Sequence, residues 1–345
     1  MKKFGKILCL FAVLFLIAVP VFSDIPGLDD LQGKVDEFTS ALANSLPFNS
    51  TMGLNWSDAY IGQLFALPPH FGVGFTAGFT TMDFGSLNEL LNMFGVHELD
   101  NIDVGGFTLP GYTIDARIGG FILPFDIGVK FGYLKLNPEF VNGLLKTDIP
   151  DFSMNNLIIG ADLRYAILDG KKFPLKLSVG AGFNYLKGGI SLPVPGAVDL
   201  SFNIPNANKV LNIPKPELAL DWETKSLDFK AQTSFNLLIL TPYIGIGATH
   251  AWSRAGYGIN SNIKITDTAS GSEIDLDSVK GEIEKYGIGG ISSEGFSHFE
   301  EVTGWSFRTF GGLSINVPFV KFDLTGMYDF ISKCYGFTFG VRFQI

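Results

Sequence analysis

The feature that most constrains this chain is a long alternation of apolar residues with small or polar ones. In residues 70–81, written HFGVGFTAGFTT, apolar side chains take every second position and glycine or threonine takes most of the others. A period of two is typical of a β-strand whose two faces meet different surroundings. The same pattern fills residues 112–122, 125–133, 157–167, 173–185, 227–239, 305–317, 320–330 and 335–345. Many of these segments are longer than the five or six residues, roughly, of strands in soluble domains.

The ionisable residues in these segments take the parity opposite to the aromatic and aliphatic residues. They are Asp115, Arg117, Asp126, Lys130, Asp162, Arg164, Lys176, Asp228, Lys230, Arg308, Lys321, Asp323, Asp329 and Arg342. A Lys or Arg facing lipid at the bilayer midplane costs roughly 2 to 4 kcal/mol, and a lumen position avoids that cost. We therefore predict a transmembrane β-barrel with these side chains in its lumen. A soluble β-sandwich or lipocalin-like barrel is the alternative, and it would bury the apolar face instead.

Composition and the N-terminal residues indicate export to a membrane. Hydrophobic residues make up 46% of the 345 residues, and Phe occurs 33 times. Residues 1–23 combine three lysines, an apolar run and small residues before Asp24, which is the layout of a cleaved signal peptide; an uncleaved anchor is the alternative. Cleavage would leave 22 basic and 34 acidic residues, a net charge of −12 that argues against nucleic acid as a partner. Cys334 would be the one cysteine left, so we expect neither a disulfide framework nor a thiolate zinc site.

Turn signals set the expected number of strands. Short connections are expected at residues 67–70, 123–124, 169–172, 241–242 and 318, and long ones at residues 83–110, 137–152, 187–226 and 256–302. Outer-membrane barrels have short periplasmic turns and longer external loops. These turns and the C-terminal segment give eleven strands, and one more in residues 45–54 would make the number even, as a closed bacterial barrel requires. We therefore predict an all-β antiparallel transmembrane barrel of about twelve strands over residues 46–345, with fourteen as the alternative.

The last eight residues have a pattern of their own. Thr338 and Gly340 are followed by the hydrophobic Phe343 and Ile345 in alternate positions. This pattern resembles the terminal β-signal of bacterial outer-membrane β-barrel proteins, although many members end on an aromatic residue in place of Ile345. The resemblance implies insertion by the barrel-assembly machinery into outer-membrane lipid, and a location in the cell outer membrane. The last strand must pair with the first, because an open edge in lipid would leave backbone groups unsatisfied.

Residues 24–45 do not fit the strand pattern. Their apolar residues, Leu28, Leu31, Val35, Phe38 and Leu42, are spaced by three and four, which predicts an amphipathic helix. A helix before the first strand could fold into the lumen as a plug, a layout weakly similar to the hatch of long-chain fatty-acid outer-membrane transporters. A periplasmic helix that packs on a partner and an assembly leader are the alternatives. Residues 86–94, SLNELLNMF, predict a second short amphipathic helix in the first external loop.

Candidate chemistry is sparse in this sequence. The four histidines, His70, His97, His250 and His298, show no metal-ligand spacing. Neither a Gly-x-Ser-x-Gly elbow nor a phosphate-binding glycine loop occurs. Residues 272–277, SEIDLD, place carboxylates at alternate positions and would suit calcium, but a solvated acidic loop is the favoured interpretation because the remaining ligands of a calcium loop are missing. We predict no metal, no cofactor and no enzymatic activity.

The lumen charges lead to the functional prediction. Eight are basic and six are acidic, so the interior is nearly neutral. Such charges form a cross-strand ion-pair network or line a narrow aqueous path with little charge selectivity. The favoured function is porin-like transport by a monomer, a channel or transporter for small or hydrophobic solutes with the N-terminal helix as a gate. The alternative is a closed barrel with a structural or adhesin-like surface-binding role through its long external loops.

Overall fold

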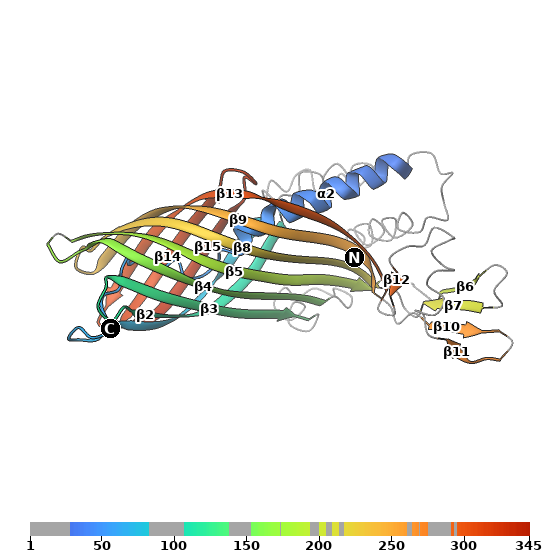
Figure 1. The fold of residues 1–345 in the computed structure, drawn as a ribbon, viewed down its shortest axis with the longest axis horizontal. Helices are drawn as coiled ribbons and strands as arrows, with labels where there is room; N and C mark the ends of the chain where they lie inside the picture. Colours follow the sequence, from blue (N-terminus) through green and yellow to red (C-terminus); the bar gives the residue numbers. More distant parts are fainter. Residues whose placement is uncertain are drawn as a thin grey trace, which may run out of the picture.

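The protein is a closed antiparallel β-barrel in the computed structural model (Figure 1). The structure describes residues 28–82, 107–137, 153–172, 174–193, 200–204, 209–213, 217–260, 264–268, 270–274, 291–292 and 295–345. In this part of the chain ten strands form the wall: β1 (Phe71–Met82), β2 (Phe107–Gly119), β3 (Phe125–Leu136), β4 (Ser153–Asp169), β5 (Leu175–Pro193), β8 (Glu217–Phe235), β9 (Leu240–Asn260), β13 (Gly295–Val317), β14 (Val320–Asp329) and β15 (Tyr335–Gln344). Each pairs with the next, and β15 pairs with β1 to close the ring.

The C-terminal strand is paired along both edges. β15 pairs with β14 on one side and with β1 on the other. The pairing reaches the end of the chain, because the backbone N–H of Ile345 donates to the carbonyl of Phe71 at 3.0 Å. The residues of the C-terminal pattern, Thr338, Gly340 and Phe343, lie in β15, and Ile345 follows directly. The strand therefore satisfies backbone groups on both neighbours, as a barrel in lipid requires.

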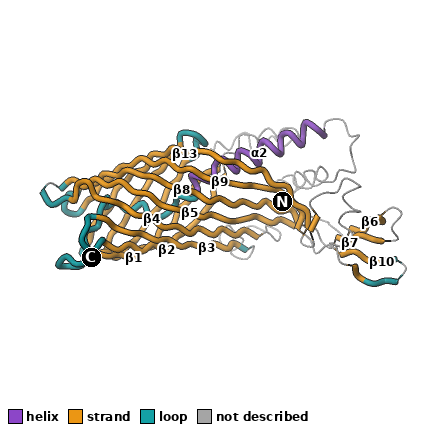
Figure 2. Tube along the Cα trace, viewed as in Figure 1, coloured by secondary structure: helices purple, strands orange, loops and turns teal. Residues whose placement is uncertain are grey.

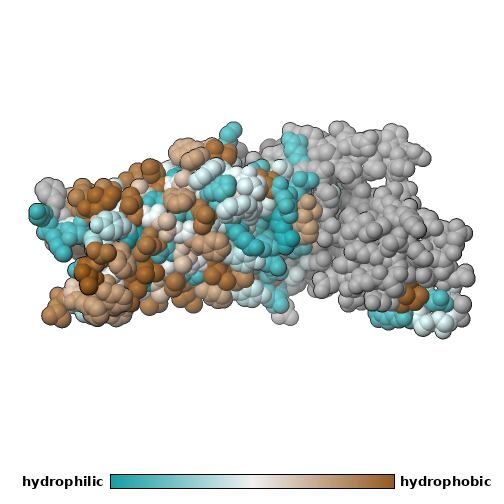
Figure 3. Space-filling model, in the orientation of Figure 1, coloured by the Kyte–Doolittle hydropathy of each residue, from teal (hydrophilic) through white to brown (hydrophobic). Residues whose placement is uncertain are grey.

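The wall turns its apolar side chains outward and its polar side chains inward. Along β4 exposed and buried residues alternate almost throughout. The exposed hydrophobic residues include Val73, Phe75, Ile114, Phe131, Leu163, Phe183, Phe229, Phe307 and Phe339. Figure 3 shows this apolar surface over much of the barrel wall. A soluble barrel would bury this face, so the soluble alternative is wrong.

The number of strands is smaller than the twelve or fourteen predicted from the sequence. The strand expected in residues 45–54 is absent from the described chain: residues up to Asn49 belong to the helix α2 (Leu28–Asn49), and no strand is assigned between residues 50 and 70. The turn at residues 67–70 therefore connects a non-strand segment to β1. Ten strands are already an even number that closes, so no further strand is required. The turn expected at residues 241–242 is also misplaced, because these residues lie within β9 and the reversal occurs at residues 236–239.

The two ends of the barrel differ. At one end, called the short-turn end, residues 120–124, 236–239 and 318–319 connect neighbouring strands tightly. At the other, the long-connection end, β5, β8, β9 and β13 have 19, 19, 21 and 23 residues and project beyond the remaining strands (Figure 1). The short strand β12 (Ile291–Ser292) pairs with the start of β13 there. The barrel wall is therefore longer on the side formed by β5, β8, β9 and β13.

A second, smaller sheet lies beyond the long-connection end (Figure 2). It consists of β6 (Leu200–Ile204) and β7 (Lys209–Ile213), from the connection between β5 and β8, and of β10 (Lys264–Asp267) and β11 (Glu273–Ile274), from the connection between β9 and β13. β7 pairs with β10, so that the two connections are joined. We call these four strands the outer sheet.

The helix predicted at residues 24–45 is present as α2, which has 22 residues and contains Pro47. Among the described residues, no helix has both the length and the apolar character needed to cross a membrane. The signal peptide of residues 1–23 and the short helix of residues 86–94 lie outside the described residues. The calcium alternative at residues 272–277 is described only to Ile274.

The seam between β1 and β15 needs a residue without a side chain at Gly78. A Cβ atom there would come within 2.1 Å of the carbonyl oxygen of Phe337 and 2.7 Å of the Cα of Thr338. Because these are backbone atoms of the partner strand, we expect Gly78→Ala to lower the free energy of unfolding by about 1–3 kcal/mol. Urea titration of the refolded protein in lipid vesicles would measure this. The matched control is Gly326→Ala in β14, where a Cβ would meet nothing within 4 Å. Equal effects of the two substitutions would contradict the account.

Candidate functional site: the occupied barrel lumen

The lumen contains part of the chain itself. From Thr39 onward α2 enters the barrel, and all residues from Ser45 to Ile61 are buried. We call residues 39–61 the lumen segment. After Asn49 and a short turn the segment has no regular secondary structure, so most of its backbone N–H and C=O groups need partners from elsewhere. The charged wall provides many of them.

Basic and amide side chains of the wall donate to carbonyl groups of the lumen segment. The Nζ of Lys130 lies 2.8 Å from the carbonyl oxygen of Ser50 and 2.6 Å from that of Met52. The amide of Gln232 donates to the carbonyl of Trp56 at 2.6 Å. Hydrogen bonds in which the donor is charged are stronger than neutral ones. Lys130 therefore holds the lumen segment in place. The alternation in the sequence predicted that its side chain faces the lumen, but not that it binds this segment.

Acidic side chains of the wall accept from N–H groups of the same segment. Asp115 accepts from the backbone of Leu54 at 3.2 Å, and Asp126 accepts from that of Ile61 at the same distance. Gly53 allows the segment to approach β2 here, since a Cβ on Gly53 would come within 2.5 Å of the Oγ1 of Thr113. Both signs of charge on the wall thus bind the segment.

Asp58 is the electrostatic centre of the lumen segment. Its carboxylate accepts from Lys176 at 3.1 Å, from Lys321 at 2.5 Å and from Arg342 at 3.0 Å. These cations come from β5, β14 and β15, and the carboxylate is buried. The carbonyl of Asp58 accepts in addition from Arg164 at 2.8 Å. A buried carboxylate needs such compensation, because an unpaired charge in a protein interior is costly.

The ring of Trp56 lies near two guanidinium groups. Arg342 lies 4.7 Å and Arg117 lies 5.7 Å from the centre of its ring. Cations within about 6 Å of an aromatic ring centroid are attracted to it. Trp56 and Asp58 were not singled out by the sequence, because their function is to fill and neutralise an interior built by other strands.

The remaining charges pair across the wall. Asp126 binds Arg117 at 2.5 Å and Arg164 at 2.8 Å; Asp162 binds Arg117 at 2.7 Å and Lys230 at 2.6 Å; Asp228 binds Arg308 at 2.6 Å; and Asp323 binds Arg342 at 3.2 Å. Asp329 accepts from the hydroxyl groups of Ser306 and Ser332, at 2.8 and 2.6 Å. The structure thus places all fourteen charges on the lumen side. Eleven of them form ion pairs with one another or with Asp58, and Asp115, Lys130 and Asp329 bind neutral groups, so these charges do not line an open path.

The half of the lumen toward the long-connection end contains an apolar cluster. One cluster of buried residues contains Leu42, Ala43, Leu46, Met52, Leu109, Met154, Ile158, Leu186, Trp222 and Ala255. Leu42 and Leu46 are one helical turn apart on α2, so they present one face of the helix to the wall. On the short-turn side of the cluster, the hydroxyl oxygens of Ser50 and Ser226 lie 2.9 Å apart. Apolar packing therefore closes one half of the lumen and ion pairs close the other.

Little free volume remains around residues 51–56 of the segment. Two cavities lie against it in the described part of the protein, one beside Lys130 and Asp162 and one beside Trp56 and Asp323, each of about 10 Å³. A volume of this size holds roughly one water molecule. Neither provides a path for a solute.

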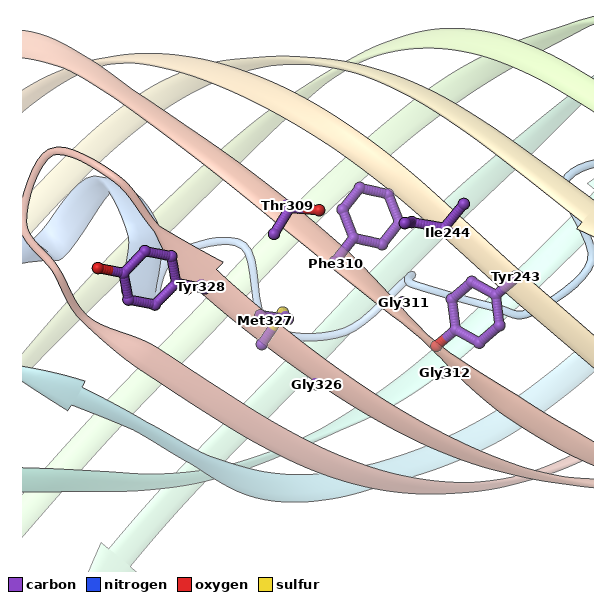
Figure 4. Close-up of a pocket in the computed structure, with 9 residues that line it drawn as sticks. All are labelled: Tyr243, Ile244, Thr309, Phe310, Gly311, Gly312, Gly326, Met327 and Tyr328. Atoms are coloured by element: carbon purple, nitrogen blue, oxygen red, sulfur yellow. The ribbon is translucent and has the colours of Figure 1, made fainter.

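The larger hollows belong to the barrel wall. One of about 370 Å³ lies along β9, β13 and β14, where Gly311, Gly312 and Gly326 contribute no side chains (Figure 4). Another of about 860 Å³ lies over β5, β8 and β9, beside the exposed rings of Phe229 and Phe307. Both include outward-facing residues, so we interpret them as depressions in the apolar outer surface. Neither hollow forms a channel through the lumen.

The described residues contain no group of three or more His, Cys, Asp or Glu arranged to hold a metal ion. His250 packs against Trp252 and Trp305, with ring centroids 4.8 and 4.9 Å apart. The Nδ1 of His70 lies 3.1 Å from the carbonyl oxygen of Ile345. His97 lies outside the described residues.

Comparison with known proteins places the chain in a family. The sequence pattern described as Lsa36-like matches residues 53–345. The chain belongs to the Lsa36-like family. The match begins within the lumen segment, so this Lsa36-like pattern includes residues 53–61 as well as every strand of the wall. No curated protein matches the chain.

Several solved structures are similar to this Lsa36-like chain at low identity. The translocator domain of the autotransporter NalP from Neisseria meningitidis has 9% identity and a TM-score of 0.33, over 92% of this chain and 98% of that chain. A major outer membrane protein from Thermus thermophilus has 10% identity and a TM-score of 0.31, over 80% and 99%. Ail, the attachment invasion locus protein of Yersinia pestis, has 9% identity and a TM-score of 0.28, over 80% and 97%. At these values the likeness carries no argument about function.

Proposed function

We propose that this protein is a closed barrel of the bacterial outer membrane whose function resides at its long-connection end. The apolar outer face, the even number of strands and the paired C-terminal strand support the membrane location. Insertion by the barrel-assembly machinery, a monomeric state and the absence of catalytic activity are parts of the same proposal. In this orientation the short turns face the periplasm and the outer sheet lies outside the cell.

The observation that supports a closed barrel is the occupied lumen. Residues 45–61 are buried, Asp58 binds three wall cations, and the cavities beside the segment hold roughly one water molecule each. A channel that is open at rest would need a continuous hydrated path. We therefore favour the surface-binding alternative over the channel that the sequence led us to prefer.

The outer sheet is the structure best suited to binding. Its strands come from two different connections and are joined by the pairing of β7 with β10, with Ile265 of β10 opposite Leu211 of β7. Cross-strand pairing gives two long connections one shared backbone geometry. Binding residues are often carried on loops positioned by a rigid scaffold, here the projecting strands β5, β8, β9 and β13.

Replacing residues 198–214 and 264–274 with short Gly/Ser linkers is expected to abolish binding while the barrel still folds. The probe is the purified, fluorescently labelled barrel, applied to arrays of immobilised proteins and glycans. Heat-modifiable migration on a gel reports the fold. The matched control replaces residues 138–152, which belong to another connection. Binding that survives loss of the outer sheet, or that is lost equally in the control, would count against this surface.

A gated channel is the second candidate, and one specific observation favours it. Each of the six acidic wall residues has a partner on the wall itself: Thr76 for Asp115, Arg117 and Arg164 for Asp126, Arg117 and Lys230 for Asp162, Arg308 for Asp228, Arg342 for Asp323 and Ser306 for Asp329. The wall would therefore keep these partners if the lumen segment withdrew. This candidate requires a signal that releases the segment, and conductance measurements test it.

A further inference from the structure

We infer that the chain threads its own barrel from the outside inward, so that polypeptide attached directly before Leu28 is displayed on the cell exterior. The inference rests on the proposed membrane location, and it goes beyond the closed state of the lumen. It assigns to the barrel the role of carrying its own N-terminal segment to the long-connection side.

The contacts of the lumen segment follow one another from end to end. Ile61 donates to Asp126, which is the second residue of β3 at the short-turn end. Ser50 contacts Ser226, halfway along β8. Leu42 packs in the cluster that contains Met154, the second residue of β4 at the long-connection end. Going backward along the chain therefore means going from the short turns toward the long connections.

The helix continues in the same direction beyond the lumen. Thr39 is fully buried, whereas Glu37 and Asn44 on the same helix are exposed, so one face of α2 packs on the wall and the other is open to solvent. The residues from Leu28 to Leu42 span roughly 21 Å of helix, at 1.5 Å per residue. Figure 1 shows α2 extending past the ends of most strands, at the same end of the barrel as the outer sheet.

Beside residues 51–56 the lumen has no room for the chain to return. The described part of the interior holds one passage of chain, and the cavities beside it are about 10 Å³ each. The wall offers no lateral exit either, because all ten strands are paired with both neighbours. A segment that precedes Leu28 therefore stays on the long-connection side.

Short epitope tags at three positions test this route in intact cells. One is placed directly before Leu28. The second replaces Gly271 between β10 and β11, where a side chain would meet nothing within 4 Å. The third replaces Gly170 in the turn between β4 and β5 at the short-turn end. Antibody labelling is measured before and after the outer membrane is permeabilised, and only protein with heat-modifiable migration is compared.

We expect the tags at Leu28 and Gly271 to be labelled on intact cells, and the tag at Gly170 to be labelled only after permeabilisation. Loss of labelling at Leu28, beside a labelled Gly271, would overturn the inference and leave the proposed location intact. Loss of labelling at Gly271 would overturn the proposed location, and this inference with it.

A tag could also be exposed because the segment had left the lumen. The tagged protein therefore carries Ser50→Cys and Ser226→Cys in a Cys334→Ala background, since the two serine hydroxyls lie 2.9 Å apart. A disulfide in the molecules that are labelled supports the threaded route. Labelled molecules without the disulfide, under conditions that oxidise it in the purified protein, would overturn it.

Discussion

Deleting residues 24–61 is expected to convert a silent barrel into a conducting one. The deletion removes the whole lumen segment, and the six acidic wall residues keep partners on the wall. The charged interior would then fill with water, because ionised groups are hydrated rather than left dry. Single-channel recording in a planar bilayer, on refolded protein with heat-modifiable migration, would show discrete conductance steps.

A shorter deletion provides the control for this result. Removing only residues 24–44 takes away most of α2 but leaves residues 45–61, all of which are buried in the lumen. These residues contain Asp58 and the carbonyl groups that bind Lys130 and Gln232. The shorter deletion is therefore expected to remain silent. If the folded protein that lacks residues 24–61 shows no conductance, the side chains of the wall must fill the lumen without the segment.

Asp58→Asn is expected to lower the free energy of unfolding by about 3–5 kcal/mol, the usual cost of removing one partner from a buried ion pair. The substitution leaves Lys176 and Lys321 without their bound carboxylate, while Arg342 keeps Asp323. Asn preserves the size of the side chain, so packing is little changed. Urea titration in lipid vesicles would measure the difference.

Asp169→Asn is the matched control for this substitution. Asp169 pairs with Lys171 at 3.3 Å in a turn, and the Lys171 side chain is 74% exposed. Pairs of this kind contribute about 0–1 kcal/mol. If Asp58→Asn cost no more than Asp169→Asn, Asp58 could not be the centre that holds the segment.

The sequence predicts the wall better than it predicts what the wall encloses. Parity alone places Arg117, Asp126 and Asp228 inward, because a strand in lipid has two faces with opposite requirements. The C-terminal pattern at Gly340 and Phe343 also predicts a paired terminal strand. These features depend on local spacing, and they can be found without knowing which strands are neighbours.

The lumen segment could not be predicted in the same way. Residues 50–61 have neither helix nor strand periodicity, and their carbonyl groups are bound by side chains that lie far away in sequence, such as Lys130 and Gln232. The requirement for an even number of strands then led us to predict a strand at residues 45–54. These residues in fact lie inside a barrel of ten strands. Tertiary contacts, not local propensity, determine the conformation of this segment.

The most direct test of the central claim is the conductance of the full-length mature protein with Ser50→Cys and Ser226→Cys in the Cys334→Ala background. Oxidation locks the lumen segment in place, and reduction releases the lock, because the two hydroxyl oxygens lie 2.9 Å apart. A barrel that is closed and acts through its outer surface is expected to be silent in both states. Conductance steps that appear on reduction and disappear on oxidation would contradict that account and establish a gated channel.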